Sequence, residues 1–505
     1  MSDQHNDTIT GKDLIEMGFK PGPWFGAVLE EANSKRLSKS QAARLAQSHI
    51  DAIEKAEAER RAREIPLRET PGPFHINLTA ETEEEQANRD AVEATFAELM
   101  RTPVLERGVV MPDACPAGPM GTIPVGGVVA ARNAILPGAH SADICCSMTA
   151  TVLEDADPKA VLDALQAVAH FGGGGRKRHE EMPLPKHLQE MIAENPMLNS
   201  GKIPGMARAH FGTSGDGNHF IFVGISKACG KTTIVTHHGS RGPGAMLYKA
   251  GMEIAERFRQ EISPETLPGN AWIPADTEEG RTYWAALQVM REWTKRSHEA
   301  IHDAAIAALG VEIHDRLWNE HNFVFEEDDG SEKGKLYWHA KGATPIHGPL
   351  LPDTAGVQIV PLNMAQPVLF VKGARSEANL GFAPHGAGRN LSRTAHKRKL
   401  GDRSDAEVFA EETAGIDARF HSGHIDVSEL PSAYKDADAV RADMARFELC
   451  EVVDEITPYG AIMAGDQQHF WRKKGKKGAK HLEARDESRN VEPQADVDQK
   501  NILKN

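Results

Sequence analysis

From Val104 onward the chain is built from short apolar runs broken by glycine and proline, and this pattern limits the folds open to it. A typical stretch, MGTIPVGGVVAARNAILPGAHSADICCSM over residues 120–148, predicts β-strands joined by tight turns. Residues 283–309 differ, because their large apolar side chains fall near one side of a helix and predict one long helix. Alternation returns at residues 359–373. The mixture predicts an α+β fold with central β-sheets flanked by helices.

Changes of composition predict three parts. Residues 1–100 are expected to form a helical N-terminal appendage, since the stretch from Ser38 to Glu64 is rich in Ala, Glu and Arg with apolar residues near helical spacing. Residues 101–470 are expected to form one large catalytic domain. Residues 471–505 are first basic and then polar, which predicts a disordered tail.

The charge balance and the cysteines narrow the class of protein. A net charge of −15 argues against indiscriminate nucleic-acid binding, although basic patches occur at residues 393–398 and 472–480. Five scattered cysteines are too few for a disulfide framework, which favours a reducing compartment. The polar N-terminus does not resemble a signal peptide, and no apolar run is long enough to cross a bilayer. We therefore expect a cytoplasmic protein without a membrane segment.

Short strings, far apart in sequence, place nucleophilic or metal-binding side chains beside glycine or asparagine. A carboxylate, a thiolate and several imidazoles together would suit Mn, Fe, Co or Zn, and a thiolate can bridge two ions. Taken singly, each of the 23 histidines is more often structural, and each glycine string is more often a tight turn. The strings are SADICCSM (141–148), GTSGDGNHF (212–220), THHGSRGPG (236–244), NEHNF (319–323) and HGAGRNLSR (385–393).

Together these strings resemble the signature motifs of the RtcB-type RNA ligases, and the resemblance runs from about Met111 to Gly465. It implies two Mn²⁺ ions. It also implies a nucleophile, His385, that attacks the α-phosphate of GTP or another nucleoside triphosphate. The metal ligands it implies are Asp143, Cys146, His219, His237 and His321. The nucleotide-binding residues it implies are Asn218, Lys341, Asn363, His385, Gly386, Gly388, Arg389 and Tyr434.

The reaction implied by the resemblance joins an RNA 2′,3′-cyclic phosphate or 3′-phosphate end to a 5′-hydroxyl end. The nucleotidyl group passes from His385 to the RNA 3′-phosphate, and the 5′-hydroxyl then displaces the nucleoside monophosphate. The implied partners are broken or cleaved RNA, such as tRNA halves, and an archease-like activating protein.

The departures from the family pattern gather where the base would be recognised. A glutamate that reads guanine in the family is replaced by Phe222, and a serine-containing stretch is replaced by residues 362–368. A C-terminal lysine is replaced by Ala464. These changes predict altered or relaxed nucleotide specificity, with ATP as an alternative to GTP. In the altered string at residues 112–115, Cys115 is either an additional site residue or a small buried side chain, and we favour the second interpretation.

Two other functions compete with the ligase interpretation. Residues 298–302 read His-Glu-Ala-Ile-His, the pattern with which a helix binds zinc in metalloproteases. One short pattern in a charge-rich helix arises readily by chance, so this alternative ranks well behind the ligase. The second is a noncatalytic RtcB-like protein that binds RNA ends. The altered base region favours it, and the complete set of metal ligands with His385 opposes it.

Overall fold

The computed structural model describes residues 8–351 and 356–466, and the chain divides into two compact units. The smaller unit comprises Met1–Pro66 with Gln260–Pro264. Its described helices pack around a small apolar core, and Ser38 caps the longest of them. These helices are α1 (Gly11–Glu16), α2 (Phe25–Ser34) and α3 (Lys39–Arg61).

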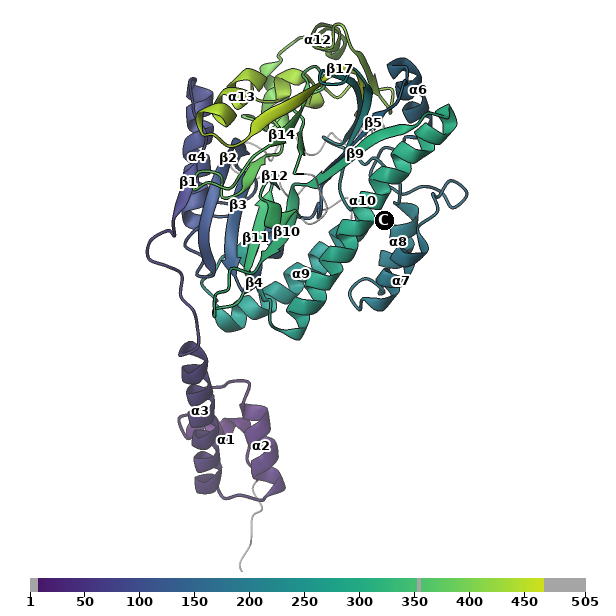
Figure 1. The fold of residues 1–505 in the computed structure, drawn as a ribbon. Helices are drawn as coiled ribbons and strands as arrows, with labels where there is room; N and C mark the ends of the chain where they lie inside the picture. The colour runs from purple at the N-terminus through teal and green to yellow at the C-terminus, as the bar shows by residue number, and fades with distance from the viewer. Residues whose placement is uncertain (1–7, 352–355, 467–505) are drawn as a thin grey trace, which may run out of the picture. The chain divides into compact units, whose positions relative to one another are not determined.

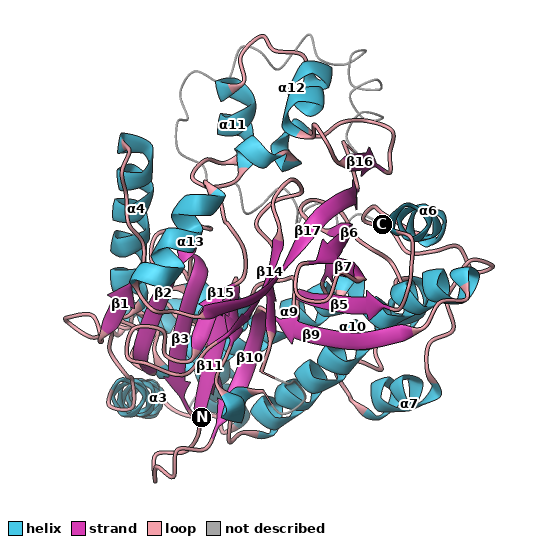
Figure 2. Ribbon diagram, turned by 45° about the horizontal axis from the view of Figure 1, so that its top comes forward, coloured by secondary structure: helices cyan, strands magenta, loops and turns pink. Residues whose placement is uncertain are grey.

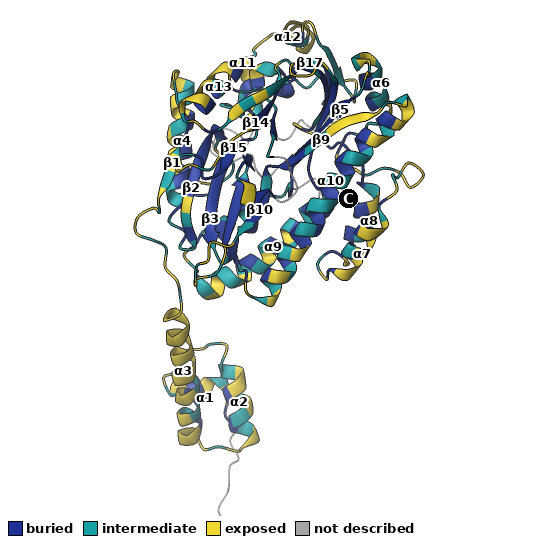
Figure 3. Ribbon diagram, in the orientation of Figure 1, coloured by how far each residue is buried: buried dark blue, intermediate teal, exposed yellow. Residues whose placement is uncertain are grey.

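The larger unit contains two main sheets. The first has the strand order β1-β2-β3-β11-β10, and its pairs are antiparallel except for the parallel pair β1–β2. Most of its side chains are buried, as the dark strands in Figure 3 show. The strands are β1 (Phe74–Ile76), β2 (Leu105–Cys115), β3 (Val125–Arg132), β10 (Asn322–Glu327) and β11 (Leu336–Lys341).

The second sheet has the strand order β13-β14-β17-β6-β7-β5-β9, and β16 pairs with β17 at one side. Two short ribbons, β4–β8 and β12–β15, complete the described strands. The second-sheet strands are β5 (Ser147–Leu153), β6 (Phe220–Ser226), β7 (Thr232–His238), β9 (Ile313–Glu320), β13 (Gln358–Val360), β14 (Val368–Lys372), β16 (Asp417–Phe420) and β17 (Glu451–Met463). The ribbons are β4 (Ala134–Ile135), β8 (Ile273–Pro274), β12 (Ala343–Pro345) and β15 (Phe382–Pro384).

The predicted long helix is confirmed as α10 (Glu278–Leu309), which packs against β5 and β7 of the second sheet (Figure 2). Thr277 caps its first turn, and Gly310 ends it in the left-handed conformation that glycine adopts most easily. The other helices of the larger unit are α4 (Glu83–Leu99), α5 (Pro137–His140), α6 (Pro158–Val168), α7 (Lys186–Glu194), α8 (Ile203–Ala209), α9 (Arg241–Ile262), α11 (Arg393–Lys399), α12 (Asp405–Glu412) and α13 (Ala437–Arg446), with short 3-10 turns at Pro268–Asn270, Gly348–Leu350, Val427–Glu429 and Pro431–Ala433.

The sheets flanked by helices confirm the predicted α+β class (Figure 1). The division of the chain falls earlier than the expected 1–100 boundary. Residues 67–100 belong to the larger unit, because β1 pairs with β2 and α4 packs on β2. The predicted tail, 471–505, lies outside the described residues. No helix among the described residues is long and apolar enough to cross a membrane.

Candidate active site

The five predicted metal ligands lie together at one end of four neighbouring strands of the second sheet, β6, β7, β5 and β9. Asp143 and Cys146 lie in the turn that leads into β5, and His219 directly precedes β6. His237 lies near the end of β7, and His321 lies between β9 and β10. The register explains why they meet: Met148 and Phe220 are both paired with His237, and Ser147 is paired with Glu320.

The ligand atoms of these residues face one another. The Cys146 sulfur lies 3.1 Å from Nε2 of His237 and 3.5 Å from Nε2 of His219. His219 Nε2 lies 3.0 Å from an Asp143 oxygen, and His237 Nε2 lies 3.1 Å from Nε2 of His321. Cys146 thus stands between two pairs, Asp143 with His219 and His237 with His321, as a thiolate shared by two cations would.

The orientation of His237 suits a metal ligand. Its Nδ1 lies 3.3 Å from the carbonyl oxygen of Asn218, so the neutral ring donates there and keeps its lone pair on Nε2. Nε2 points at the Cys146 sulfur and at Nε2 of His321. Nitrogen and sulfur lone pairs that converge in a buried space favour a cation between them.

The pKa shifts of the cluster residues also favour a bound cation. Burial lowers the pKa of His237 and of His321 well below 6.5, so both rings are neutral and able to ligate. Burial, reinforced by the Asp143 carboxylate, raises the pKa of the Cys146 thiol well above its usual range. Burial would also raise the pKa of Asp143, but the neighbouring His219 and Arg241 outweigh it and lower that pKa. A cation would be needed to hold Cys146 as the thiolate.

His385, the predicted nucleophile, lies beside this cluster at the end of β15. Its ring centre is 4.8 Å from that of His321. Its Nδ1 lies 2.5 Å from Oδ2 of Asp113, a fully buried carboxylate in β2. The bond to Asp113 fixes the tautomer and directs the lone pair of Nε2 away from the carboxylate. We did not identify Asp113 from the sequence, although it lies in the Pro-Asp string at residues 112–115 that the family also carries.

Two glycines allow His385 and Asp113 to approach this closely. Gly342 has φ +73°, and a Cβ there would lie 2.9 Å from Cε1 of His385. Gly388 has φ +72°, and a Cβ there would collide with the carbonyl oxygen of Asp113. Both positions therefore require glycine for conformational and steric reasons. The other predicted glycine, Gly386, lies in the same loop, against the carbonyl of Pro361.

Arg389 and Tyr434 meet next to the nucleophile loop. The Arg389 guanidinium lies 4.5 Å from the centre of the Tyr434 ring and donates to the Ser428 carbonyl and to Glu429. Glu429 is buried, and it also accepts from the Tyr434 hydroxyl and from Arg393. Arg389 covers one face of the ring, so a base can stack only on the other. Glu429 was missed from the sequence because a lone glutamate carries no local signal.

The remaining predicted nucleotide contacts differ in their surroundings. Lys341 ends β11 and donates to the Ile123 carbonyl (3.1 Å), and burial lowers its pKa to about 8. Asn218 has an exposed side chain in the loop before His219. The Asn363 side chain accepts from the backbone of Ala365 at 3.0 Å and so closes a turn. The contact shown for Asn363 shapes its own loop.

The region that departs from the family pattern is apolar. Phe222 is fully buried in β6 and packs in one cluster with Met364 and Val368. None of these three side chains offers a hydrogen bond to a base edge. Cys115 is half-buried at the end of β2, and burial raises the pKa of its thiol.

The two histidines of the His-Glu-Ala-Ile-His pattern belong to the protein core. His298 bonds to Thr236 (2.7 Å) and to Ser147 (3.1 Å). His302 bonds to Thr236 (2.8 Å) and to Thr151 (2.7 Å). Both rings are fully buried, and all four ring nitrogens are engaged with protein groups. The pattern therefore joins α10 to the second sheet, and the metalloprotease alternative is wrong.

Comparison with known proteins identifies the family. The family model described as tRNA-splicing ligase RtcB matches residues 175–464. A tRNA-splicing ligase RtcB of Archaeoglobus fulgidus is 27% identical over 445 residues, which cover 74% of this chain and 90% of the relative. An RNA-splicing ligase RtcB of Escherichia coli K12 is 30% identical over 360 residues, which cover 65% and 84%. With that match and this site, the chain belongs to the RtcB family of splicing ligases.

Proposed function

We propose that this enzyme, an RNA ligase by its family, joins an RNA 2′,3′-cyclic phosphate or 3′-phosphate end to a 5′-hydroxyl end, with His385 as the carrier of a nucleotidyl group. The observation that carries the proposal is the position of His385. It is bonded through Nδ1 to the buried Asp113 and lies directly beside the metal-ligand cluster. A histidine oriented in this way, next to several convergent ligands, suits nucleophilic attack on phosphorus.

Two divalent cations, Mn²⁺ by resemblance, would be held by the ligand cluster. Asp143, Cys146 and His219 would hold one, and Cys146, His237 and His321 would hold the other. The fit rests on the convergent lone pairs and on a buried thiol that needs a positive neighbour. When bound, such ions neutralise phosphate charge and help to orient the reacting groups.

His385 would act first. Its Nε2 lone pair attacks the α-phosphate of the triphosphate; the new N–P bond forms as the bond to pyrophosphate breaks. Asp113 accepts the Nδ1 hydrogen bond and stabilises the positive charge that develops on the ring. An oxygen of the RNA 3′-phosphate then takes the nucleotidyl group from His385; a 2′,3′-cyclic phosphate would first add water and break its bond to the 2′-oxygen to give this 3′-phosphate. Finally the 5′-hydroxyl attacks the activated phosphate, loses its proton and releases the nucleoside monophosphate.

The nucleotide is GTP by resemblance, and we propose that its recognition is altered or relaxed. Phe222, Met364 and Val368 form a buried apolar cluster, and none of them supplies the carboxylate that would be needed to accept from guanine. By resemblance, the ring of Tyr434 would stack on the base. Stacking without a base-edge acceptor would discriminate weakly between purines, so ATP becomes an alternative donor.

The substrates would be cleaved tRNA or other broken RNA ends in the cytoplasm, and an archease-like protein is the proposed activator. The names of the relatives, tRNA-splicing and RNA-splicing ligases, support RNA as the class of substrate.

The test is covalent labelling. Purified protein is incubated with Mn²⁺ and each α-³²P-labelled nucleoside triphosphate in turn, and acid-labile, alkali-stable label on the protein is measured. We expect label that is absent from His385→Ala, and transfer of the label to an RNA 3′-phosphate. A strong preference for GTP would overturn the altered specificity. No label with any nucleotide would favour the noncatalytic RNA-end binding protein.

A further inference from the structure

A glycine-rich loop with a basic end lies against the metal site. Residues 172–175 are four glycines in a row, and Arg176, Lys177 and Arg178 follow them. Backbone bonds tie the start of the loop to the segment that precedes the ligand His219: Gly172 donates to Gly215 (2.7 Å). Arg241 donates to the Gly172 carbonyl (2.9 Å) with one nitrogen and lies 3.3 Å from His219 with another.

The side chains of this loop divide into one anchor and two that face solvent. Arg176 is turned inward, where it donates to the carbonyls of Val168 (2.7 Å) and Gly212 (2.8 Å). Lys177 and Arg178 are exposed, and neither forms an ion pair with any residue that the structure describes. Two carboxylates follow them, Glu180 and Glu181, and Glu180 lies 3.3 Å from His179.

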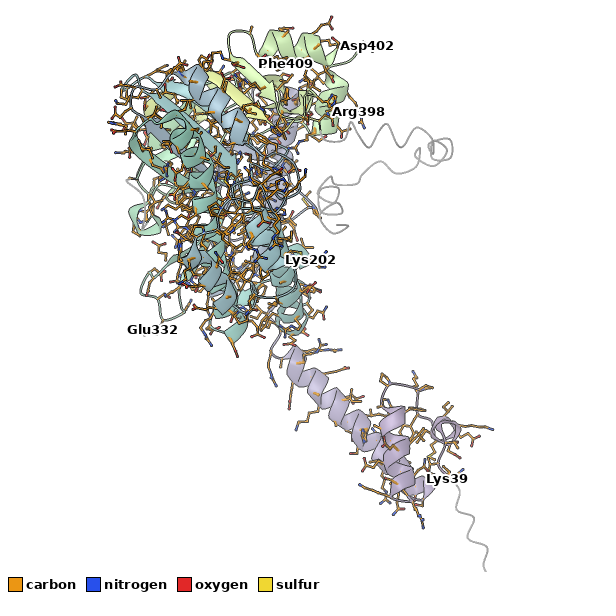
Figure 4. All side chains as sticks on the ribbon, turned by 90° about the vertical axis from the view of Figure 1, so that its right-hand side faces the viewer. Lys39, Lys202, Glu332, Arg398, Asp402 and Phe409 are labelled. Carbon is orange, nitrogen blue, oxygen red and sulfur yellow. The ribbon has the colours of Figure 1, made fainter. Side chains whose placement is uncertain are left out.

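A second basic segment borders the loop of residues 215–218, which the glycine-rich loop contacts at Gly215. A Cβ on Gly217 would lie 3.5 Å from Nη2 of Arg393, the first residue of α11. Within α11, Lys397 is paired with Asp426 and Lys399 with Glu84. Arg398 is exposed and forms no ion pair within the described part of the chain; it is labelled in Figure 4.

The loop of residues 215–218, directly before His219, therefore lies between the two segments that carry these cations, which follow Gly172 on one side and Arg393 on the other. The protein as a whole carries a net charge of −15, so these cations lie on a protein that is acidic overall. A polyanion would be repelled by most of the surface and attracted to this rim. An enzyme that joins two strands has to hold two phosphate backbones near the reacting ends.

We propose that Lys177 and Arg178 on one flank, and Arg398 on the other, form a basic rim that binds the backbone phosphates of the two RNA ends. The inference rests on the proposed function for the identity of the ligand. Phosphate contacts of this kind position a strand without reading its sequence.

The test measures RNA binding without nucleotide. Two fluorescent single-stranded RNAs, one with a 3′-phosphate and one with a 5′-hydroxyl end, are titrated by anisotropy across a series of salt concentrations. For K177A/R178A we expect the slope of log affinity against log salt to become shallower by about 1.4, or about 0.7 per lost contact. For R398A we expect about half that change. If K177A/R178A weakens the binding of one RNA and R398A weakens the binding of the other, each flank binds a different RNA end.

The matched control is K333A/K335A. These lysines lie in the hairpin between β10 and β11, whose opposite ends carry Asn322 and Lys341 at the site; a strand of six residues places them about 20 Å away. Figure 4 shows the neighbouring Glu332 on the side of the unit away from Arg398. Unchanged slopes in both rim variants, or an equal change in the control, would overturn the proposal. The variant K177R/R178K should keep the parent slope if charge is what matters.

The two proposals fail differently. Labelling of His385 does not require RNA, and binding of RNA does not require His385 to react. Normal labelling with an unchanged salt slope would overturn the rim and leave the ligase mechanism in place. A shallower slope with no labelling of the parent protein would overturn the mechanism and keep the rim.

Discussion

Strand β7 separates two groups of buried histidines that look alike in sequence and differ in chemistry. His237 points toward His321 and Cys146, where nitrogen and sulfur lone pairs face one another. Thr236, its neighbour on the strand, points to the opposite face and bonds to His298 and His302 of α10. On one face Nε2 of His237 faces Nε2 of His321 and the Cys146 sulfur, and on the other every ring nitrogen of His298 and His302 has a polar partner. Hydrogen-bond satisfaction, and not burial, distinguishes a candidate ligand from a structural histidine.

We expect the largest effect from a substitution in the metal-ligand cluster. Cys146→Ala removes the sulfur shared by both ligand pairs, and we expect bound Mn²⁺ to be lost and ligation to fall by roughly 10³-fold or more. Binding in the parent should strengthen as the pH rises, because the ion displaces a proton from a thiol whose pKa is raised. Metal per chain, measured by elemental analysis, and activity across pH test this. Retention of two ions by the variant would contradict it.

The orientation of the nucleophile provides the next test. Asp113→Asn keeps the size of the side chain but removes the charge that faces Nδ1 of His385. We expect His385 labelling to slow by about 10²-fold, in the range of a lost acid–base partner. Bound metal should be unchanged, because Asp113 lies outside the ligand cluster. A normal labelling rate would show that the short contact does not orient the ring.

The structural histidines should affect stability and not metal binding. His298→Ala leaves the hydroxyl of Ser147 and the carbonyl of His238 without this partner. We expect a loss of about 3 kcal/mol in the free energy of unfolding, since each unsatisfied buried group costs about 1–3 kcal/mol. Metal per folded chain should remain that of the parent. Loss of metal without loss of stability, by denaturant titration, would contradict the division between the two groups.

The same histidines give stability a pH dependence. Burial lowers the pKa of His298 and of His302 well below 6.5, so the folded protein keeps both rings neutral. Below about pH 6.5 the unfolded chain binds more protons than the folded one, and the free energy of unfolding therefore falls as the pH falls. Replacement of His302 by Gln should flatten this dependence. An equally steep dependence in the variant would place its origin in other groups.

The two groups also show what sequence can and cannot provide. Asp143, Cys146 and His219 were predicted because each lies in a short string whose residues are neighbours in sequence. The pairing of His385 with Asp113 spans 272 residues and could not be read from spacing. Glu429 was missed because a lone glutamate carries no local signal. Helix α10 was predicted from its apolar periodicity, whereas the role of its histidines depends on which strand the helix meets. The N-terminal boundary was misplaced because α4 has a helical pattern like that of α3, and only its contact with β2 assigns it to the larger unit.

The smallest effect is expected at Glu299, the residue between the two structural histidines. In a metalloprotease it would be the general base, and its replacement would abolish activity. Here its carboxylate lies 2.6 Å from Arg296 on the same helix, a partly exposed pair of the kind that contributes about 0.3–0.5 kcal/mol. Glu299→Gln should therefore leave His385 labelling, bound metal and ligation within about twofold of the parent. Gln keeps the shape of the side chain, so any large loss would have to come from the charge. Loss of labelling with unchanged stability would show that α10 takes part in the chemistry of the site. It would contradict the division of the buried histidines into candidate ligands on one face of β7 and structural residues on the other.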